Sequence, residues 1–173
     1  LRNNANVREV YGLEGDYDAE QVTPEQAQAL LEKHGVRATI YTSPSHTPDK
    51  PRWRVLAPLS EGHPPEERER LVARLNGCLG GILANESFTL SQSYYYGRVN
   101  GYYTCLHTFD DPLEGTCIDE LHDLDEIAVG KRHDDTAGAS ARARAMVERL
   151  GRGLRTGDGR RDLLKSLVVG LAR

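Results

Sequence analysis

The stretch TPEQAQALLEKHGVRATIYTS, residues 23–43, contains a helix with defined ends and the start of a strand. Thr23 suits an N-cap, Pro24 the first helical position, and Gln26 the third position of a capping box. Gly35 is the kind of residue that ends a helix, and the β-branched residues behind it predict a strand. The stretch therefore predicts a helix followed directly by a strand.

The segments on either side extend this unit. Apolar and polar residues alternate over 7–18, which indicates a strand before the helix, and RWRVLAPL at 52–59 predicts another strand after it. The segment 64–83 predicts a helix with leucines on one face that is ended by Gly80 and Gly81, and SQSYYYGRV at 91–99 predicts a fourth strand. The order β-α-β-β-α-β predicts an α+β fold with a ferredoxin-like or RRM-like split β-α-β core and its helices on one face.

The sequence patterns that predict helices and strands are weaker in the C-terminal third of the chain. Residues 102–109 predict a further strand, and the acidic segment 118–130 a short helix or an irregular edge. An Ala- and Arg-rich helix is expected over 137–150. We therefore expect a catalytic domain over 1–135 and, over 136–173, a helical tail that begins a linker to a further C-terminal region.

Charge is distributed unevenly along the chain. Residues 142–173 hold nine Lys and Arg against three Asp and Glu, whereas the first 141 residues hold 13 against 23. No apolar run approaches the roughly 20 residues that span a bilayer, so no membrane role is expected. There is no leader pattern, and three scattered cysteines form no disulfide framework, so we expect a cytoplasmic protein.

Two carboxylates stand at the predicted end of the first strand. Asp16 and Asp18 are two positions apart, so they point to the same face and can share a divalent cation. The first two strands are joined by a helix, so in one sheet they run parallel and end at the same edge. The second strand ends at Ser45 and His46, which should therefore lie near these acids.

Basic residues follow in the next hairpin. Lys50, Arg52 and Arg54 begin the third strand near the same edge, with the two arginines on one face. Carboxylates suit Mg²⁺ or Mn²⁺, while Arg and His suit phosphate, so the set predicts a metal-bound triphosphate site. Taken singly, each residue also has an ordinary interpretation: a solvated strand end, a histidine that caps backbone, and an exposed strand face.

With these residues placed, residues 6–131 resemble the archaeo-eukaryotic primase superfamily, specifically the primase-polymerase domains of plasmid and phage replication proteins. The first catalytic motif of that family, D-x-D, matches Asp16 and Asp18. The second, a small residue and a histidine on the next strand, matches the SPSH stretch that ends in Ser45 and His46. The third, an acid that completes the metal site, matches Glu86.

The resemblance implies a DNA primase-polymerase that uses two Mg²⁺ or Mn²⁺ ions for template-directed nucleotidyl transfer in plasmid or phage replication. Its partners would be a DNA template and primer and nucleoside triphosphates, in the cytoplasm of a bacterial host. A helicase module would follow in the longer protein, since no P-loop pattern G-x-x-x-x-G-K-[ST] occurs in this chain. The implied phosphate contacts are Ser45, His46, Lys50, Arg52 and Arg54.

Other interpretations stay open. Paired carboxylates and a histidine also serve metal-dependent nucleases, and such a sheet also serves as a non-catalytic nucleic-acid-binding module. Tyrosines 94–96 could stack on a base or simply pack a strand. Zinc is not expected, because the spacing of its possible ligands is not that of a zinc knuckle. Those ligands are Cys105, His107, Cys117 and His122.

Overall fold

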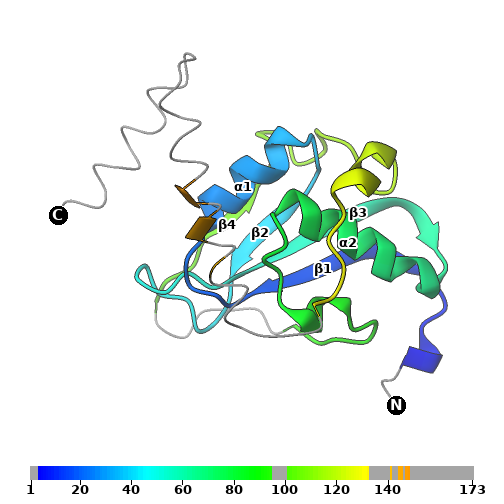
Figure 1. Cartoon of the computed structure of the whole chain (residues 1–173), viewed down its shortest axis with the longest axis horizontal. Helices are drawn as coiled ribbons and strands as arrows, with labels where there is room; N and C mark the ends of the chain where they lie inside the picture. Colours follow the sequence, from blue (N-terminus) through cyan, green and yellow to red (C-terminus); the bar gives the residue numbers. More distant parts are fainter. Residues whose placement is uncertain (1–3, 95–100, 133–140, 142–143, 146, 149–173) are drawn as a thin grey trace.

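The computed structural model describes residues 4–94, 101–132, 141, 144–145 and 147–148 (Figure 1). In chain order its elements are η1 (Asn4–Asn6), β1 (Val10–Tyr17), α1 (Pro24–Lys33), β2 (Thr39–Thr42), β3 (Trp53–His63), η2 (Pro65–Glu67), α2 (Arg68–Cys78), η3 (Asn85–Phe88), β4 (Cys105–His107) and η4 (His122–Ile127), where η marks a 3-10 helix. The structure is an α+β fold, as the sequence predicts.

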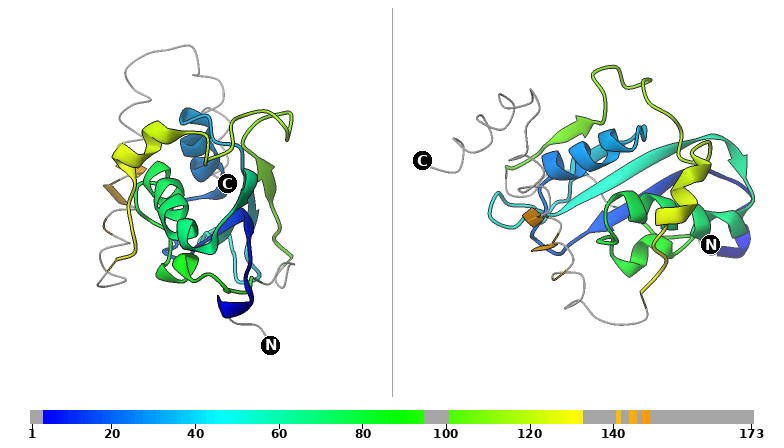
Figure 2. Two further views of the ribbon diagram at one scale, coloured as in Figure 1. Left: turned by 90° about the vertical axis from the view of Figure 1, so that its right-hand side faces the viewer. Right: turned by 45° about the horizontal axis from the view of Figure 1, so that its top comes forward.

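The four strands form one antiparallel sheet in the order β1-β3-β2-β4. Because β1 and β2 each pair antiparallel with β3, they run parallel to each other with β3 between them, as predicted. The edge strand β4 pairs with β2. Both α1 and α2 lie on the same side of this sheet (Figure 2).

The ends of α1 agree with the sequence prediction. The Thr23 hydroxyl accepts the backbone N–H of Gln26, and the Gln26 side chain accepts the N–H of Thr23, so the capping box is complete. Gly35 follows the helix with φ of 69°, a conformation that suits glycine. This helix is therefore fixed by its own local sequence.

The core lies between the helices and the sheet, where residues alternate along the strands between the buried and the open face. Tyr17 and Trp53 are register partners on the buried face, and their rings stack with centroids 4.6 Å apart. The Trp53 indole N–H donates to the Val22 carbonyl at 2.8 Å. The ends of β1 and β3 that carry the predicted site are thus anchored by large buried rings.

Two predicted elements differ from the structure. The helix expected from residue 64 begins only at Arg68, after η2, although its end at Cys78 agrees with the stop expected at Gly80 and Gly81. The acidic segment contains the short η4, in agreement with the short helix or irregular edge expected there. No strand forms over 91–94, the described part of the predicted fourth strand; the other part and most of the predicted helical tail lie outside the described residues. Tyr94 lies over Arg54 on the sheet instead. Within the described residues no helix is long and apolar enough to cross a membrane.

Candidate functional site

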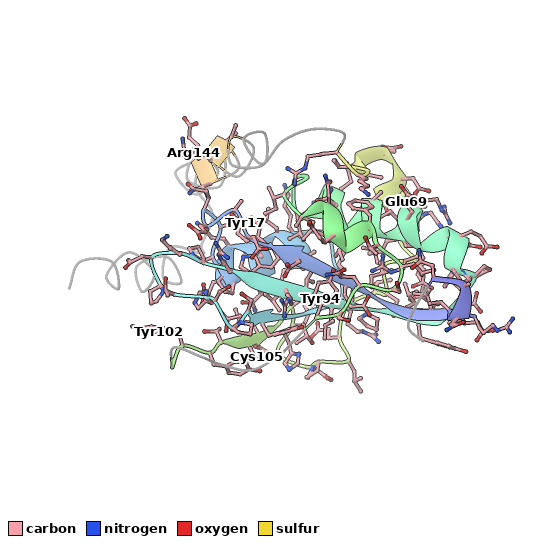
Figure 3. The ribbon with its side chains drawn as sticks, turned by 90° about the horizontal axis from the view of Figure 1, so that it is seen from below. Tyr17, Glu69, Tyr94, Tyr102, Cys105 and Arg144 are labelled. Carbon is pink, nitrogen blue, oxygen red and sulfur yellow. The ribbon has the colours of Figure 1, made fainter. Side chains whose placement is uncertain are left out.

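The acids and arginines predicted to converge do so on the open face of the sheet. Asp16 of β1 is the register partner of Arg54 of β3, and Arg54 in turn is opposite Tyr41 of β2. Directly opposed residues in a sheet share one face, so these three side chains form a row across three strands. This face points away from α2. Figure 3 shows Glu69 of α2 on one side of the sheet and Cys105 on the other.

Asp16 is a mostly buried carboxylate with a cationic partner. Arg54 Nε donates to Asp16 Oδ1 at 2.8 Å, and the two side chains are only 15% and 14% exposed. Burial and the neighbouring Asp18 carboxylate raise the pKa of Asp16 to about 6, against the opposing effect of Arg54. Asp16 and Asp18 thus form a pair of carboxylates whose mutual repulsion a bound cation would relieve.

Arg54 is held from several directions. Its guanidinium lies 5.1 Å from the centre of the Tyr94 ring, a cation-π distance, in addition to its bond with Asp16. The structure therefore places Arg54 as the counter-ion of Asp16. Its predicted contact with phosphate stays a prediction.

Arg52 lies one step further along the same edge, among acids. Its Nη1 is 3.9 Å from Asp18 Oδ1, and its Nε and Nη2 donate to Glu20 Oε1 at 3.0 and 2.6 Å. Lys50 Nζ lies 3.8 Å from Glu20 Oε2. Two of the predicted phosphate contacts therefore share one carboxylate, Glu20.

His46 lies at the start of the hairpin between β2 and β3. Its Nδ1 accepts the backbone N–H of Arg52 at 3.2 Å, which fixes Nε2 as the protonated nitrogen of the neutral ring. His46 is only 9% exposed, and this burial lowers the pKa of its imidazole. At neutral pH His46 is therefore a hydrogen-bond donor through Nε2–H rather than a cation.

The serines of the SPSH stretch differ in exposure. Ser43 is buried and its backbone N–H donates to the Arg52 carbonyl at 3.0 Å, whereas Ser45 is exposed. Their hydroxyl oxygens are 3.3 Å apart. The hairpin thus links His46 to Arg52 directly and Ser45 to Arg52 through Ser43.

Glu86 belongs to η3, which is docked against the end of β1. The Asp16 backbone N–H donates to Ser87 Oγ at 2.9 Å, and the Ala84 N–H donates to the Asp16 carbonyl at 2.8 Å. The Glu86 side chain is exposed. The structure therefore brings the Glu86 segment beside Asp16, while the role of its carboxylate stays a prediction.

The donor chemistry of this edge suits a hard divalent cation, because Asp16 and Asp18 offer oxygen ligands from adjacent carboxylates. Among the residues that the structure describes, no group of three or more His, Cys, Asp or Glu side chains is gathered as a metal site. The pair provides ligands for one ion. A second ion needs further ligands.

Sequence reasoning missed Glu20 and Arg68. Glu20 continues the spacing of Asp16 and Asp18 by two further positions in DYDAE, and this acidic run was the available signal. Arg68 is buried and donates to the Ser87 carbonyl at 2.8 Å and to Glu14 Oε2 at 3.1 Å. It joins α2, η3 and β1, and no local pattern could have indicated that role.

Comparison with known proteins gives no relative. No family model matches the chain, and no curated protein and no solved structure is similar to it.

Proposed function

We propose that this domain is a primase-polymerase of the archaeo-eukaryotic type, which carries out template-directed nucleotidyl transfer. The observation that supports it is a series of contacts at one sheet edge: the Asp18 carboxylate, which neighbours that of Asp16, lies 3.9 Å from Arg52 Nη1, and the Arg52 backbone N–H donates to His46 Nδ1. Acids for a metal and donors for phosphate are the two groups that this chemistry needs side by side.

In this proposal the carboxylates of Asp16 and Asp18 bind Mg²⁺ or Mn²⁺, with Glu86 as the third acid of a two-ion site. When bound, the metal supplies Lewis-acid polarisation of phosphoryl oxygens and activation of the attacking hydroxyl. Arg54 keeps Asp16 available by stabilising its ionised form.

The phosphates would be held by the hairpin side chains. Arg52 and Lys50 supply positive charge, and Ser45 and His46 supply hydrogen-bond donors, His46 through Nε2–H. Because His46 is neutral, we assign it a positioning role toward a phosphate oxygen rather than charge neutralisation.

The wider setting follows from the same proposal. The core would be of the ferredoxin-like class, with a helical tail that leads to a helicase module. Its partners would be a DNA template and primer and nucleoside triphosphates, in the cytoplasm of a bacterial host.

The test is incubation of the protein with labelled primer-template, Mn²⁺ and nucleotides. We expect extension by the wild type and loss of extension, with DNA binding kept, in Asp16→Asn plus Asp18→Asn. Asp110→Asn plus Asp111→Asn removes the same charge from an exposed loop and should leave extension unchanged.

The other outcomes separate the rival functions. Shortening of the primer without any need for nucleotides would indicate a metal-dependent nuclease. DNA binding without extension or cleavage would indicate a non-catalytic nucleic-acid-binding module. Extension that survives in the Asp16 and Asp18 double variant would show that these acids are not the metal site.

A further inference from the structure

Glu20 is the acid most closely bound to the basic hairpin. Arg52 donates to one of its carboxylate oxygens through both Nε and Nη2, at 3.0 and 2.6 Å, and Lys50 lies 3.8 Å from the other. The bond with Arg52, followed by the charges of Arg52 and Lys50, lowers the pKa of Glu20. Glu20 is thus ionised at neutral pH and occupies the Arg52 and Lys50 donors that could otherwise bind an anion.

The backbone of the turn is shaped to place this carboxylate. Glu20 has φ of 58°, in the left-handed region that non-glycine residues rarely adopt. The turn is fixed behind it, because the buried Tyr17 hydroxyl accepts the N–H groups of Gln21 and Val22 at 2.9 and 2.8 Å. An unfavourable conformation held by a buried anchor is typical of a functional position.

The charges around this turn are balanced. Three acids, Asp16, Asp18 and Glu20, face three basic residues, Lys50, Arg52 and Arg54. An incoming polyphosphate would therefore meet no net positive charge while Glu20 stays in place. Removal of Glu20 from Arg52 frees the Nε and Nη2 groups of the guanidinium, while Nη1 stays 3.9 Å from Asp18, and leaves one uncompensated positive charge for the anion.

We propose that Glu20 is a displaceable counter-ion which occupies, on Arg52, the place of a phosphate group of a polyphosphate ligand. Carboxylate and phosphate both accept the paired N–H groups of a guanidinium, so one can replace the other. Glu20 then sets the affinity of the hairpin for polyphosphate, since an anion binds only by displacing it. This inference rests on the proposed role of Arg52 in triphosphate binding.

The test is calorimetric titration of the protein with inorganic tripolyphosphate, without added metal. Glu20→Gln should bind it more tightly than the wild type, by roughly two- to tenfold, because a partly exposed ion pair no longer competes. Glu61→Gln removes the same negative charge at the far, exposed end of β3 and should change the affinity less than twofold.

Two further variants make the result specific. In Glu20→Gln plus Arg52→Gln the gain should disappear, because the freed guanidinium is its cause. Glu20→Gly removes the carboxylate and also suits φ of 58°, so it should reproduce the gain without a cost in folding.

The outcomes are separable from those of the proposed function. The inference is overturned if Glu20→Gln and Glu20→Gly bind tripolyphosphate no more tightly than Glu61→Gln, or not at all, even where primer extension is intact. A gain that depends on Arg52, in a protein without primer extension, would keep Glu20 as the counter-ion of a polyphosphate site and overturn only the primase-polymerase assignment.

Discussion

Asp16 and Arg54 are directly opposite each other on neighbouring strands, and Arg54 Nε donates to Asp16 Oδ1 at 2.8 Å. The pair is mostly shielded from water, and the Asp18 carboxylate is close enough to Asp16 to raise its pKa. Asp16 is therefore subject to two opposing influences: burial and Asp18 favour its protonated form, and Arg54 favours its ionised form. The balance between them decides when the carboxylate pair can accept a cation.

The first prediction concerns the pH dependence of cation binding. The pKa of Asp16 is about 6, and a metal binds the ionised carboxylate. We expect Mn²⁺ affinity to be constant at high pH and to fall as the pH decreases through about 6, by up to tenfold per pH unit below it. Calorimetric titration with Mn²⁺ at several pH values measures this. An affinity that stays unchanged between pH 7.5 and about 5 would exclude Asp16 as a ligand.

The second prediction concerns Arg54. Arg54→Gln removes the charge that lowers the pKa of Asp16, so the midpoint of Mn²⁺ binding should move to higher pH. Arg54→Lys should shift it less, because it keeps the charge. Arg70→Gln removes an equal charge from the exposed surface of α2 and should leave the midpoint in place. A midpoint common to all three variants would mean that Arg54 does not control Asp16.

The third prediction concerns His63, at the end of β3. Its ring nitrogens lie 3.0 Å from Glu67 Oε2 and 3.1 Å from Asp119 Oδ2, and the hydrogen bond to Glu67, followed by that to Asp119, raises the pKa of His63 against the effect of burial. A raised histidine pKa stabilises the fold below the unfolded pKa, and this stability is lost as the pH rises through the folded value.

The free energy of unfolding of His63→Gln should therefore lie below that of the wild type at pH 5.5 by about 0.5–1 kcal/mol, and the difference should shrink by pH 9. His34 serves as the contrast, because burial lowers its pKa, so acid should destabilise the wild type relative to His34→Gln. Urea denaturation at both pH values measures these differences. A His63→Gln deficit that grows with pH would contradict the assignment.

Local sequence signals predicted the parts of this fold that depend on local physics. The capping box of Thr23 and Gln26 fixes α1. Because a helix connects β1 and β2, these strands run parallel, and β3, which returns antiparallel between them, brings Arg54 opposite Asp16. What could not be predicted depends on contacts distant in sequence. Tyr94 lies over Arg54, about 40 residues away, and the left-handed turn at Glu20 is held by the buried Tyr17 hydroxyl.

The start of α2 was also predicted too early in the sequence, because η2 precedes the helix, and Gly77 shows a distant contact at its C-terminal end. A Cβ on Gly77 would lie 2.1 Å from the Ile127 carbonyl oxygen and 2.8 Å from the carbonyl carbon, so the backbone after η4 packs directly on the helix. This segment is bound to α2 by the Val129 N–H, which donates to the Ala73 carbonyl at 2.9 Å. Backbone cannot shift aside as the end of a flexible side chain can.

The last prediction is that Gly77→Ala destabilises the protein by about 1–3 kcal/mol, even though alanine is favoured over glycine inside a helix by about 1 kcal/mol. Gly130→Ala is the matched control, because a Cβ there meets nothing within 4 Å and should leave the stability nearly unchanged. Urea denaturation of both variants gives the comparison. If Gly77→Ala were instead more stable than Gly130→Ala, the segment after η4 could not be packed on α2 as the structure has it, since the helix preference of alanine would then act unopposed.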